Sequence, residues 1–280
     1  MAGTEAADVA GSLAGKIPPR ACSAMTGSEF ANFIASMDGA SREQAILDEL
    51  KRANMPDFLR RLKPVALRHM LESGRVATVT IFVMPDYLAI GSDDDFLRIP
   101  MALPTAVEIA NRFGFILPTR RMVDAIFQQS VFQLAPEPMP PGPQMRSTAY
   151  YWEHNQKINE QSAACRLLLG ALVSGHKKDV VLSDRLNRYG RRVAIYGWHH
   201  LSGVPIQPLS TVHGAEYADY SHGIRLVGDT ILLDGNPCSI YTVLGDVRLA
   251  GVLSDEGVIR EARWLMTSLS QTRTRPARTF

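Results

Sequence analysis

Histidine is concentrated in one stretch of this chain. Five of the seven histidines lie between residues 176 and 222: His176, His199, His200, His213 and His222. The histidine side chain changes charge near neutral pH and is the most common metal ligand in proteins, so this concentration points to acid–base or metal chemistry. We therefore predict that the functional site lies between His176 and Arg225.

The elements expected around these histidines would bring them to one edge of a sheet. The block GHKKDVV (175–181) joins a predicted helix to a strand, YGWH (196–199) ends a second strand, and residues 213–222 form a loop before a third strand. Strand ends and loops on a rigid sheet are where reactive side chains usually gather. The expected catalytic residues are His176, Asp179, His213, Asp219 and His222. The expected substrate-binding residues are Lys178, His199, Tyr217, Ser221 and Arg225.

Two kinds of hydrolytic site can be built from these residues, and the sequence leaves both open. In the first, three of the histidine and aspartate side chains hold a zinc ion that activates water, with Glu216 or another carboxylate as general base. The spacing matches no zinc motif on a helix, so a zinc cofactor rests on residue types alone. In the second, Lys177, Lys178 and Arg225 hold an anionic or carbonyl substrate, and His222 acts as acid and base beside Asp179 or Asp219.

A third possibility is a cysteine nucleophile at Cys165 with His222 as its base. The hairpin that begins at residue 221 (SHGIRL, then ILL at 231–233) resembles the histidine-bearing hairpin of the NlpC/P60 peptidoglycan peptidases. Those enzymes carry their cysteine at a helix N-terminus, where the thiolate is favoured. Cys165 instead stands in the predicted apolar helix AACRLLL (163–169), which favours a core position.

Three blocks of the chain also resemble segments of a group of bacterial proteins that look exported: GHKKDVV, YGWH and DYSHGIRL (219–226). This resemblance implies that the blocks form one site. It supplies no reaction. With the hairpin resemblance, it implies a substrate in the cell envelope or an extracellular polymer.

Composition limits the class of protein. The 280 residues include 30 basic and 28 acidic side chains, for a formal charge of +2, which argues against an extended nucleic-acid footprint. No apolar run approaches the roughly 20 residues of a transmembrane helix. Residues 1–22 lack a signal-peptide pattern, and export stays open if such a segment has been removed. Three cysteines without a C-x-x-C pair support neither a disulfide scaffold nor a zinc knuckle.

The hydrophobic pattern predicts an α/β chain of the α+β type, with a mixed or antiparallel sheet flanked by helices. Residues 1–25 are expected to be a disordered leader, and residues 26–280 a single domain that begins with a helical segment. Residues 76–84 (VATVTIFVM) predict a strand because they are rich in β-branched side chains. Helices are predicted at 104–113, 119–133, 151–174 and 254–269.

Two features have more than one interpretation. Residues 135–143 (APEPMPPGP) predict an extended connector, which is either a linker between domains or a strap across one domain. Tyr150, Tyr151 and Trp152, with His154 and Asn155, form either a platform for sugar rings or a surface that packs a helix onto the sheet.

The function that these observations favour is hydrolysis of a small-molecule or polymer substrate, with a cell-envelope or extracellular polymer as the specific expectation. The competing interpretation is a non-catalytic module that binds a glycan or an anionic ligand.

Overall fold

The computed structural model describes residues 2–189 and 191–271. Its helices begin and end as follows: α1 Ala2–Gly15, α2 Gly27–Phe33, α3 Gly39–Lys51, α4 Leu103–Phe113, α5 Arg120–Gln129, α6 Thr148–Ala164, α7 Arg185–Arg188, α8 Ile240–Gly245 and α9 Ala262–Gln271. Short 3₁₀ turns occupy Asp57–Arg60, Pro143–Arg146 and Ala250–Val252.

Two sheets carry most of the strands. The larger sheet has the order β14-β13-β2-β12-β5, with β1 paired to β2 outside that path. Its strands are β1 Lys63–Met70, β2 Val76–Val83, β5 Phe115–Ile116, β12 Val227–Gly228, β13 Thr230–Leu233 and β14 Asn236–Ser239. The smaller sheet has the order β10-β9-β8-β11 and comprises β8 Lys178–Val180, β9 Ile195–His199, β10 Pro205–Ser210 and β11 His222–Gly223.

Two further pairs complete the strands. β3 Ala89–Gly91 pairs with β4 Phe96–Arg98 in antiparallel fashion, and β6 Phe132–Gln133 pairs with β7 Val173–Ser174 in parallel. Within the smaller sheet β8 and β11 are parallel, whereas all pairs of the larger sheet are antiparallel. The predicted α+β fold with mixed or antiparallel sheets and an N-terminal helix is confirmed.

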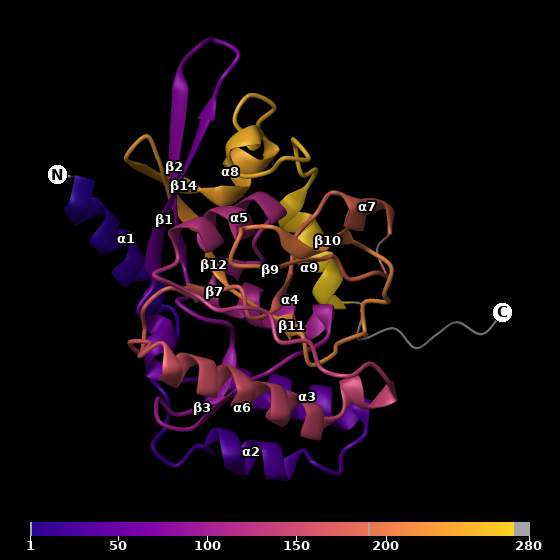
Figure 1. The fold of residues 1–280 in the computed structure, drawn as a ribbon. Helices are drawn as coiled ribbons and strands as arrows, with labels where there is room; N and C mark the ends of the chain where they lie inside the picture. The colour runs from indigo at the N-terminus through magenta and orange to yellow at the C-terminus, as the bar shows by residue number, and fades with distance from the viewer. Residues whose placement is uncertain (1, 190, 272–280) are drawn as a thin grey trace.

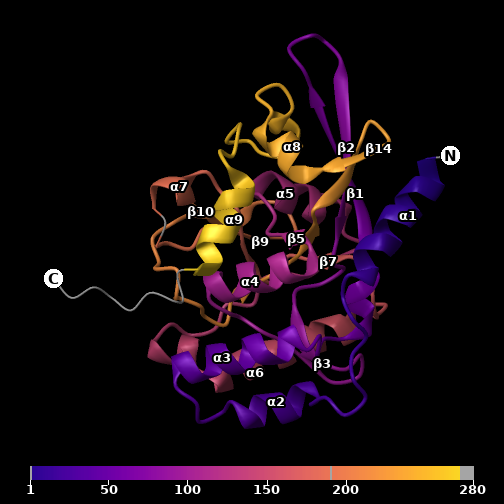
Figure 2. The same cartoon turned by 180° about the vertical axis from the view of Figure 1, so that it is seen from behind.

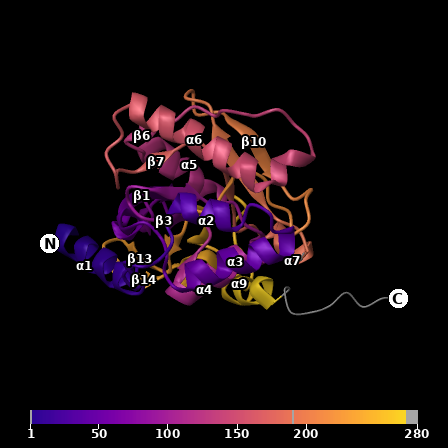
Figure 3. The ribbon, with the colours of Figure 1, turned by 90° about the horizontal axis from the view of Figure 1, so that it is seen from below.

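The layers can be followed in the figures. Helices α2, α3 and α6 lie below the sheets, and the β1–β2 hairpin projects from the opposite end (Figure 1). Helices α4 and α9 lie side by side on the rear face (Figure 2). From below, α6 and β10 lie on one side of the molecule and α4 and α9 on the other (Figure 3).

Local sequence signals explain several boundaries. Thr26 caps α2 in a capping box with Glu29, and Thr119 caps α5 through the backbone N–H of Met122. Gly114 ends α4 in the left-handed conformation that glycine adopts at little cost. Strand β2 has the β-branched composition from which it was predicted.

Several expectations differ from the structure. The helix expected from residue 254 begins only at Ala262. Residues 1–25 are not a disordered leader, because α1 forms there and buries Leu13 against the body of the protein. The helix expected to extend to residue 174 ends at Ala164, where Arg166 takes a positive φ. Residues 222–233 are not one hairpin, since they divide into β11, β12 and β13, which belong to two sheets.

The proline-rich segment 135–143 crosses the surface as a strap. Met139 within it is buried in the main hydrophobic core, which includes residues before and after the segment. The backbone N–H of Met139 donates to the Tyr220 hydroxyl at 2.7 Å. The segment therefore connects α6 and the 213–222 loop to the same hydrophobic core.

Candidate functional site

The smaller sheet is where the predicted site residues meet. Its register pairs Lys178 of β8 with Gly197 of β9 and with His222 of β11, and the next residue, Asp179, pairs with Tyr196. Residues paired across a sheet point to the same face, and successive residues point to opposite faces. The sheet therefore places His222 and Lys178 on one face and Asp179 on the other.

One face gathers six of the ten predicted residues, which we call the His222 cluster: Lys178, His213, Tyr217, Asp219, Ser221 and His222. The Asp219 carboxylate organises the cluster. Its Oδ1 accepts hydrogen bonds from the backbone N–H and the hydroxyl of Ser221, at 2.8 and 2.6 Å. Its Oδ2 accepts from the Tyr217 hydroxyl at 3.0 Å and lies 4.0 Å from Nε2 of His222.

His222 is buried, and neither of its ring nitrogens has a hydrogen-bond partner among the described residues. Buried polar groups in folded proteins normally have partners, so two unpartnered nitrogens on one ring mark a place where a ligand or water belongs. Burial lowers the pKa of His222 to about 4, although Asp219 opposes the shift. The ring is therefore a neutral base at pH 7.

Half-buried side chains surround this histidine. His213 stacks on Tyr217 with ring centroids 4.1 Å apart, and the Tyr217 ring lies 5.7 Å from that of His222. Nζ of Lys178 lies 5.0 Å above the centre of the Trp198 ring. Trp198 adopts a φ of +55°, a conformation that bulky residues rarely take and that is common at functional sites.

The opposite face of the sheet holds Asp179. Its Oδ2 accepts a hydrogen bond from the Tyr87 hydroxyl at 2.9 Å, and its Oδ1 has no partner among the described residues. Burial raises the pKa of Asp179 to about 6. Gly223, which pairs with Asp179, leaves room for the Tyr87 ring, because a Cβ at position 223 would lie 2.6 Å from that ring. Asp179 is thus sealed inside the protein, away from the His222 cluster.

The Arg225 side chain links two backbone segments. Its two terminal nitrogens donate to the carbonyl oxygens of Met84 and Val173, at 2.8 and 2.7 Å, and its guanidinium lies over the Tyr87 ring. The side chain is fully buried. The expected contact of Arg225 with substrate therefore finds no support in the geometry, which gives Arg225 a structural position.

His176 belongs to a separate buried network. Its Nε2 lies 3.0 Å from Oδ1 of Asp86, whose Oδ2 pairs with Arg98 at 2.8 Å. Burial lowers the pKa of His176 to about 4, although Asp86 opposes the shift. Asp86 and Arg98 also line a hollow of about 540 Å³, which is flanked by Phe96 and Trp152.

His199 forms a third arrangement near the surface. Its Nε2 lies 2.9 Å from Oδ1 of Asp124, which also accepts from the Tyr196 hydroxyl at 2.8 Å. The His199 ring stacks on Phe127 with centroids 4.6 Å apart. These side chains line a hollow of about 540 Å³, together with Gln133. His199 therefore lies apart from the other predicted substrate-binding residues.

Sequence reasoning missed several residues of these networks. Asp86 follows an apolar strand directly, which is a signal that could have indicated it, whereas Asp124 lies within a predicted helix and carries no such signal. Lys177 was expected to hold an anionic or carbonyl substrate, whereas it is 1% exposed and its Nζ donates to the Tyr220 carbonyl. Burial lowers the pKa of Lys177 to about 7. Both ring nitrogens of the buried His154 are also without partners among the described residues.

The zinc hypothesis finds no ligand set. No group of three or more histidine, cysteine, aspartate or glutamate side chains within residues 2–189 and 191–271 is arranged to hold a metal ion. Cys165 is not placed as a nucleophile, because it lies at the C-terminal end of α6 and not at a helix N-terminus. The expected core position of Cys165 is wrong as well, since its side chain is exposed. Of the metal-free arrangement, Lys178, Asp219 and His222 lie on one face of the sheet, whereas Asp179 and Arg225 lie elsewhere.

Fold and geometry thus define an α+β protein in which a cluster around the buried His222 and Asp219 lies on one face of a small mixed sheet. Comparison of the chain with protein-family models, curated proteins and solved structures finds no match in any of the three. Among the described residues, no helix is both long enough and apolar enough to cross a membrane.

Proposed function

We propose that this protein is a metal-independent hydrolase that uses His222, aligned by Asp219, as its general acid and base. The observation that carries the proposal is the buried His222 ring, whose two nitrogens lack partners while a fixed carboxylate lies 4.0 Å away. A neutral histidine close to a carboxylate can act as a general acid and base, because the carboxylate stabilises the imidazolium that forms.

The proposed reaction is hydrolysis of an ester or amide bond in a cell-envelope or extracellular polymer. The neutral His222 ring takes a proton from water as the water oxygen attacks the carbonyl carbon. Asp219 stabilises the imidazolium that forms, and the Lys178 ammonium stabilises the negative charge on the carbonyl oxygen. The imidazolium then returns its proton to the departing amine or alcohol, so that one water is consumed for each bond broken.

The cluster has features that suit these roles. The Asp219 carboxylate is fixed by Ser221 and Tyr217, and although burial opposes it, His222 and Ser221 hold the pKa of Asp219 below its usual value. Asp219 is therefore charged at neutral pH. Lys178 and His213 are half-buried, whereas His222 is buried. We propose that a substrate reaches His222 past these two side chains.

The test measures release of soluble dye from dye-labelled peptidoglycan and, in parallel, from dye-labelled gelatin, whose chain is joined by amide bonds, and dye-labelled cutin, which is joined by ester bonds. His222→Ala should lower the rate of release by about a hundredfold or more, as expected for loss of a general acid–base group. Asp219→Asn should lower it as well. His200→Ala is the matched control, because His200 is an exposed histidine of the same sequence region and should keep the wild-type rate.

Two results would contradict the proposal. The first is a folded His222→Ala variant, with an unchanged circular dichroism spectrum, that releases dye at the wild-type rate. The second is a wild-type protein that releases no dye from any of the three polymers.

A specific observation also favours the binding interpretation. The hollow next to Asp86 and Arg98 is lined by the aromatic rings of Phe58, Phe96 and Trp152, and polar side chains of α6 face the same space. Aromatic faces and amide groups together suit a saccharide ring. Trp152 is the one member of the predicted Tyr150–Trp152 platform that lines this hollow.

Saccharide binding without hydrolysis would appear as retention of the protein on insoluble peptidoglycan or chitin with no release of soluble fragments. Trp152→Ala should abolish retention, and Trp264→Ala, which changes a tryptophan that is 61% exposed, should not. Equal retention of both variants would contradict a saccharide site in this hollow.

A further inference from the structure

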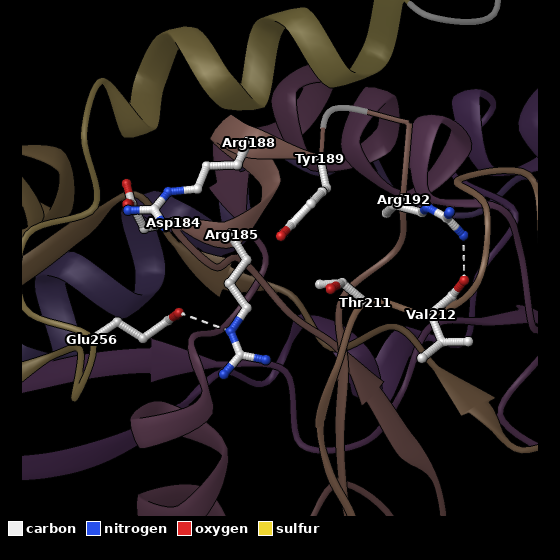
Figure 4. A pocket seen from close by; sticks show the side chains of 8 residues that line it. All are labelled: Asp184, Arg185, Arg188, Tyr189, Arg192, Thr211, Val212 and Glu256. Atoms are coloured by element: carbon white, nitrogen blue, oxygen red, sulfur yellow. Dashed lines mark hydrogen bonds and ion pairs between the residues drawn. The ribbon is translucent and has the colours of Figure 1, made fainter.

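A basic hollow of about 740 Å³ lies beside the His222 cluster and is used by no part of the proposed reaction. It lies between α7, Tyr189, Arg192 and the end of β10 (Figure 4). Three arginines, Arg185, Arg188 and Arg192, line it together with Tyr189 and Thr211. The run RLNRYGRR (185–192) places four arginines within eight residues, and the three that line the hollow outnumber its two acidic residues, Asp184 and Glu256.

The two acidic residues of the hollow have partners, and one of these partners is Arg185 of the hollow itself. Asp184 accepts hydrogen bonds from the Asn187 amide at 2.9 Å and from the backbone N–H of Arg260 at 3.1 Å. Glu256 accepts from the Ser183 hydroxyl at 3.0 Å and lies 3.8 Å from Nε of Arg185. Two carboxylates therefore face three guanidinium groups, and both carboxylates already have partners.

The arginines keep free hydrogen-bonding capacity. Arg188 forms no hydrogen bond or ion pair with any described residue, and Arg192 uses one terminal nitrogen for the Val212 carbonyl. Arg185 donates from one terminal nitrogen to the Leu209 carbonyl. Figure 4 shows the Tyr189 hydroxyl directed into the space between Arg185 and Thr211. Each guanidinium carries five N–H donors, so most of the donors here remain available.

We propose that this hollow binds a phosphate group carried by a larger molecule. Guanidinium groups bind phosphate oxygens through paired N–H donors, and a phosphate offers more oxygens than a carboxylate. The three guanidinium groups point to different parts of the hollow (Figure 4), so they suit the phosphate and the larger group that carries it. The hydroxyls of Tyr189 and Thr211 add neutral donors. The hollow is within the size range of small-molecule sites, so it has room for the group that carries the phosphate.

The position of the hollow connects it to the His222 cluster. Thr211 and Val212 line it and lead directly into His213, and Arg192 pairs with Gly214 in an isolated β-bridge. A phosphorylated molecule bound here would thus contact the base of the loop that carries the cluster. The inference does not depend on hydrolysis, since it rests on the hollow and its arginines alone.

The test is calorimetric titration of the full-length protein with phenyl phosphate, with inorganic phosphate and acetate as comparison ligands. Phenyl phosphate should bind one site per chain, and Arg188→Ala and Arg192→Ala should each weaken binding by about tenfold, the effect of one charge-assisted hydrogen-bonding group. Arg52→Ala is the matched control, because Arg52 is an exposed arginine at the end of α3, and it should change affinity by less than about twofold.

The comparison ligands identify the source of the phosphate. Tighter binding of phenyl phosphate than of inorganic phosphate indicates a phosphate ester, and equal binding indicates free phosphate. Acetate binding as tight as that of phenyl phosphate, or wild-type affinity in the Arg188→Ala and Arg192→Ala variants, would overturn the proposal. His222→Ala should bind phenyl phosphate with wild-type affinity, so failure of the proposed hydrolysis and failure of this inference give different results.

Discussion

Buried ionisable side chains are the most unusual feature of this protein at the scale of single residues. His176, Lys177, Asp179, His222 and Arg225 are each at most 3% exposed. Removing charge from water is costly unless the charge is paired or the group becomes neutral. Each of these groups therefore makes the stability of the fold sensitive either to pH or to the loss of one partner.

His222 should make the protein sensitive to acid. Its folded-state pKa of about 4 is below the ordinary value of 6.5, so the unfolded chain takes up the proton first as pH falls. The stability present at pH 7.5 is then lost between pH 6.5 and 4. We expect wild-type protein to lose about 2 kcal/mol more than His222→Gln between pH 7.5 and 5.

Urea unfolding at the two pH values measures this difference. His200→Gln is the control, because His200 is exposed and its replacement should leave the pH dependence as it is in the wild type. Identical losses in His222→Gln and wild type would show that His222 is not buried in its neutral form.

Asp86 should be the most sensitive carboxylate. It is buried between Arg98 and His176, so Asp86→Asn leaves the Arg98 guanidinium buried without a charged partner. Breaking a buried ion pair costs about 3 kcal/mol or more, and we expect a loss of that size in the free energy of unfolding. Asp57→Asn, which breaks the more exposed pair with Arg60, should cost less than about 1 kcal/mol. Equal losses in guanidinium unfolding would contradict the network.

At the scale of elements, two short features hold the segments around the His222 cluster together. The proline-rich strap 135–143 is fastened to the 213–222 loop by a few hydrogen bonds, and β11 packs against β8 only because Gly223 has no side chain. Both contacts join segments far apart in sequence. Each can be tested by one substitution.

The strap should loosen when the Tyr220 hydroxyl is removed. That hydroxyl accepts from the Met139 backbone N–H at 2.7 Å, so Tyr220→Phe leaves a buried N–H without a partner. We expect hydrogen exchange at the Met139 amide to become about fivefold faster, in proportion to the loss of roughly 1 kcal/mol. Tyr150→Phe removes a bond to the Pro140 carbonyl instead and should leave the Met139 amide protected. Unchanged exchange in Tyr220→Phe would contradict the fastening.

Gly223 should not tolerate a side chain. A Cβ there would lie 2.6 Å from the Tyr87 ring and 2.7 Å from Cβ of Lys177. Gly223→Ala should therefore cost about 1–3 kcal/mol, the usual effect of overpacking. Gly39→Ala, at the start of α3 with nothing within 4 Å, should be neutral or stabilising. Chemical denaturation of both variants distinguishes these outcomes, and equal stability would place β11 farther from β8.

At the scale of the whole molecule, one hydrophobic core connects both ends of the described chain. The core includes Val9 of α1 and Leu269 of α9, and the two sheets contribute to it together. Helix α1 is therefore part of the body that carries the site.

Leu13→Ala should show this dependence. Leu13 is 1% exposed and lies over Gly228 of the larger sheet, so its truncation leaves a cavity in the core. A loss of about 3 kcal/mol is expected, with unfolding still in one transition. Glu5→Ala, at an exposed position of the same helix, should have little effect. A melting temperature unchanged by Leu13→Ala would contradict the packing of α1 into the core.

The sequence by itself determined the elements whose signals are local. The β-branched run of β2, the capping box at Thr26 and the glycine that ends α4 each depend on residues within one or two turns of chain. The concentration of histidine indicated residues 176–225, and six of the ten residues predicted there lie together in the structure; their role in a reaction stays a prediction. These features were predictable because propensity, capping and composition act over short distances.

Only the tertiary structure decided which of those residues meet. The register of β8 with β9 and β11 separates Asp179 from His222, although both belong to the same predicted site. Asp86 and Asp124 join the histidines from elements about 90 and 75 residues away in sequence. The helix at residues 2–15 is also a result of tertiary structure, because its apolar side chain Leu13 packs against Gly228 of the larger sheet. Pairing between distant segments depends on the whole fold, and no local pattern encodes it.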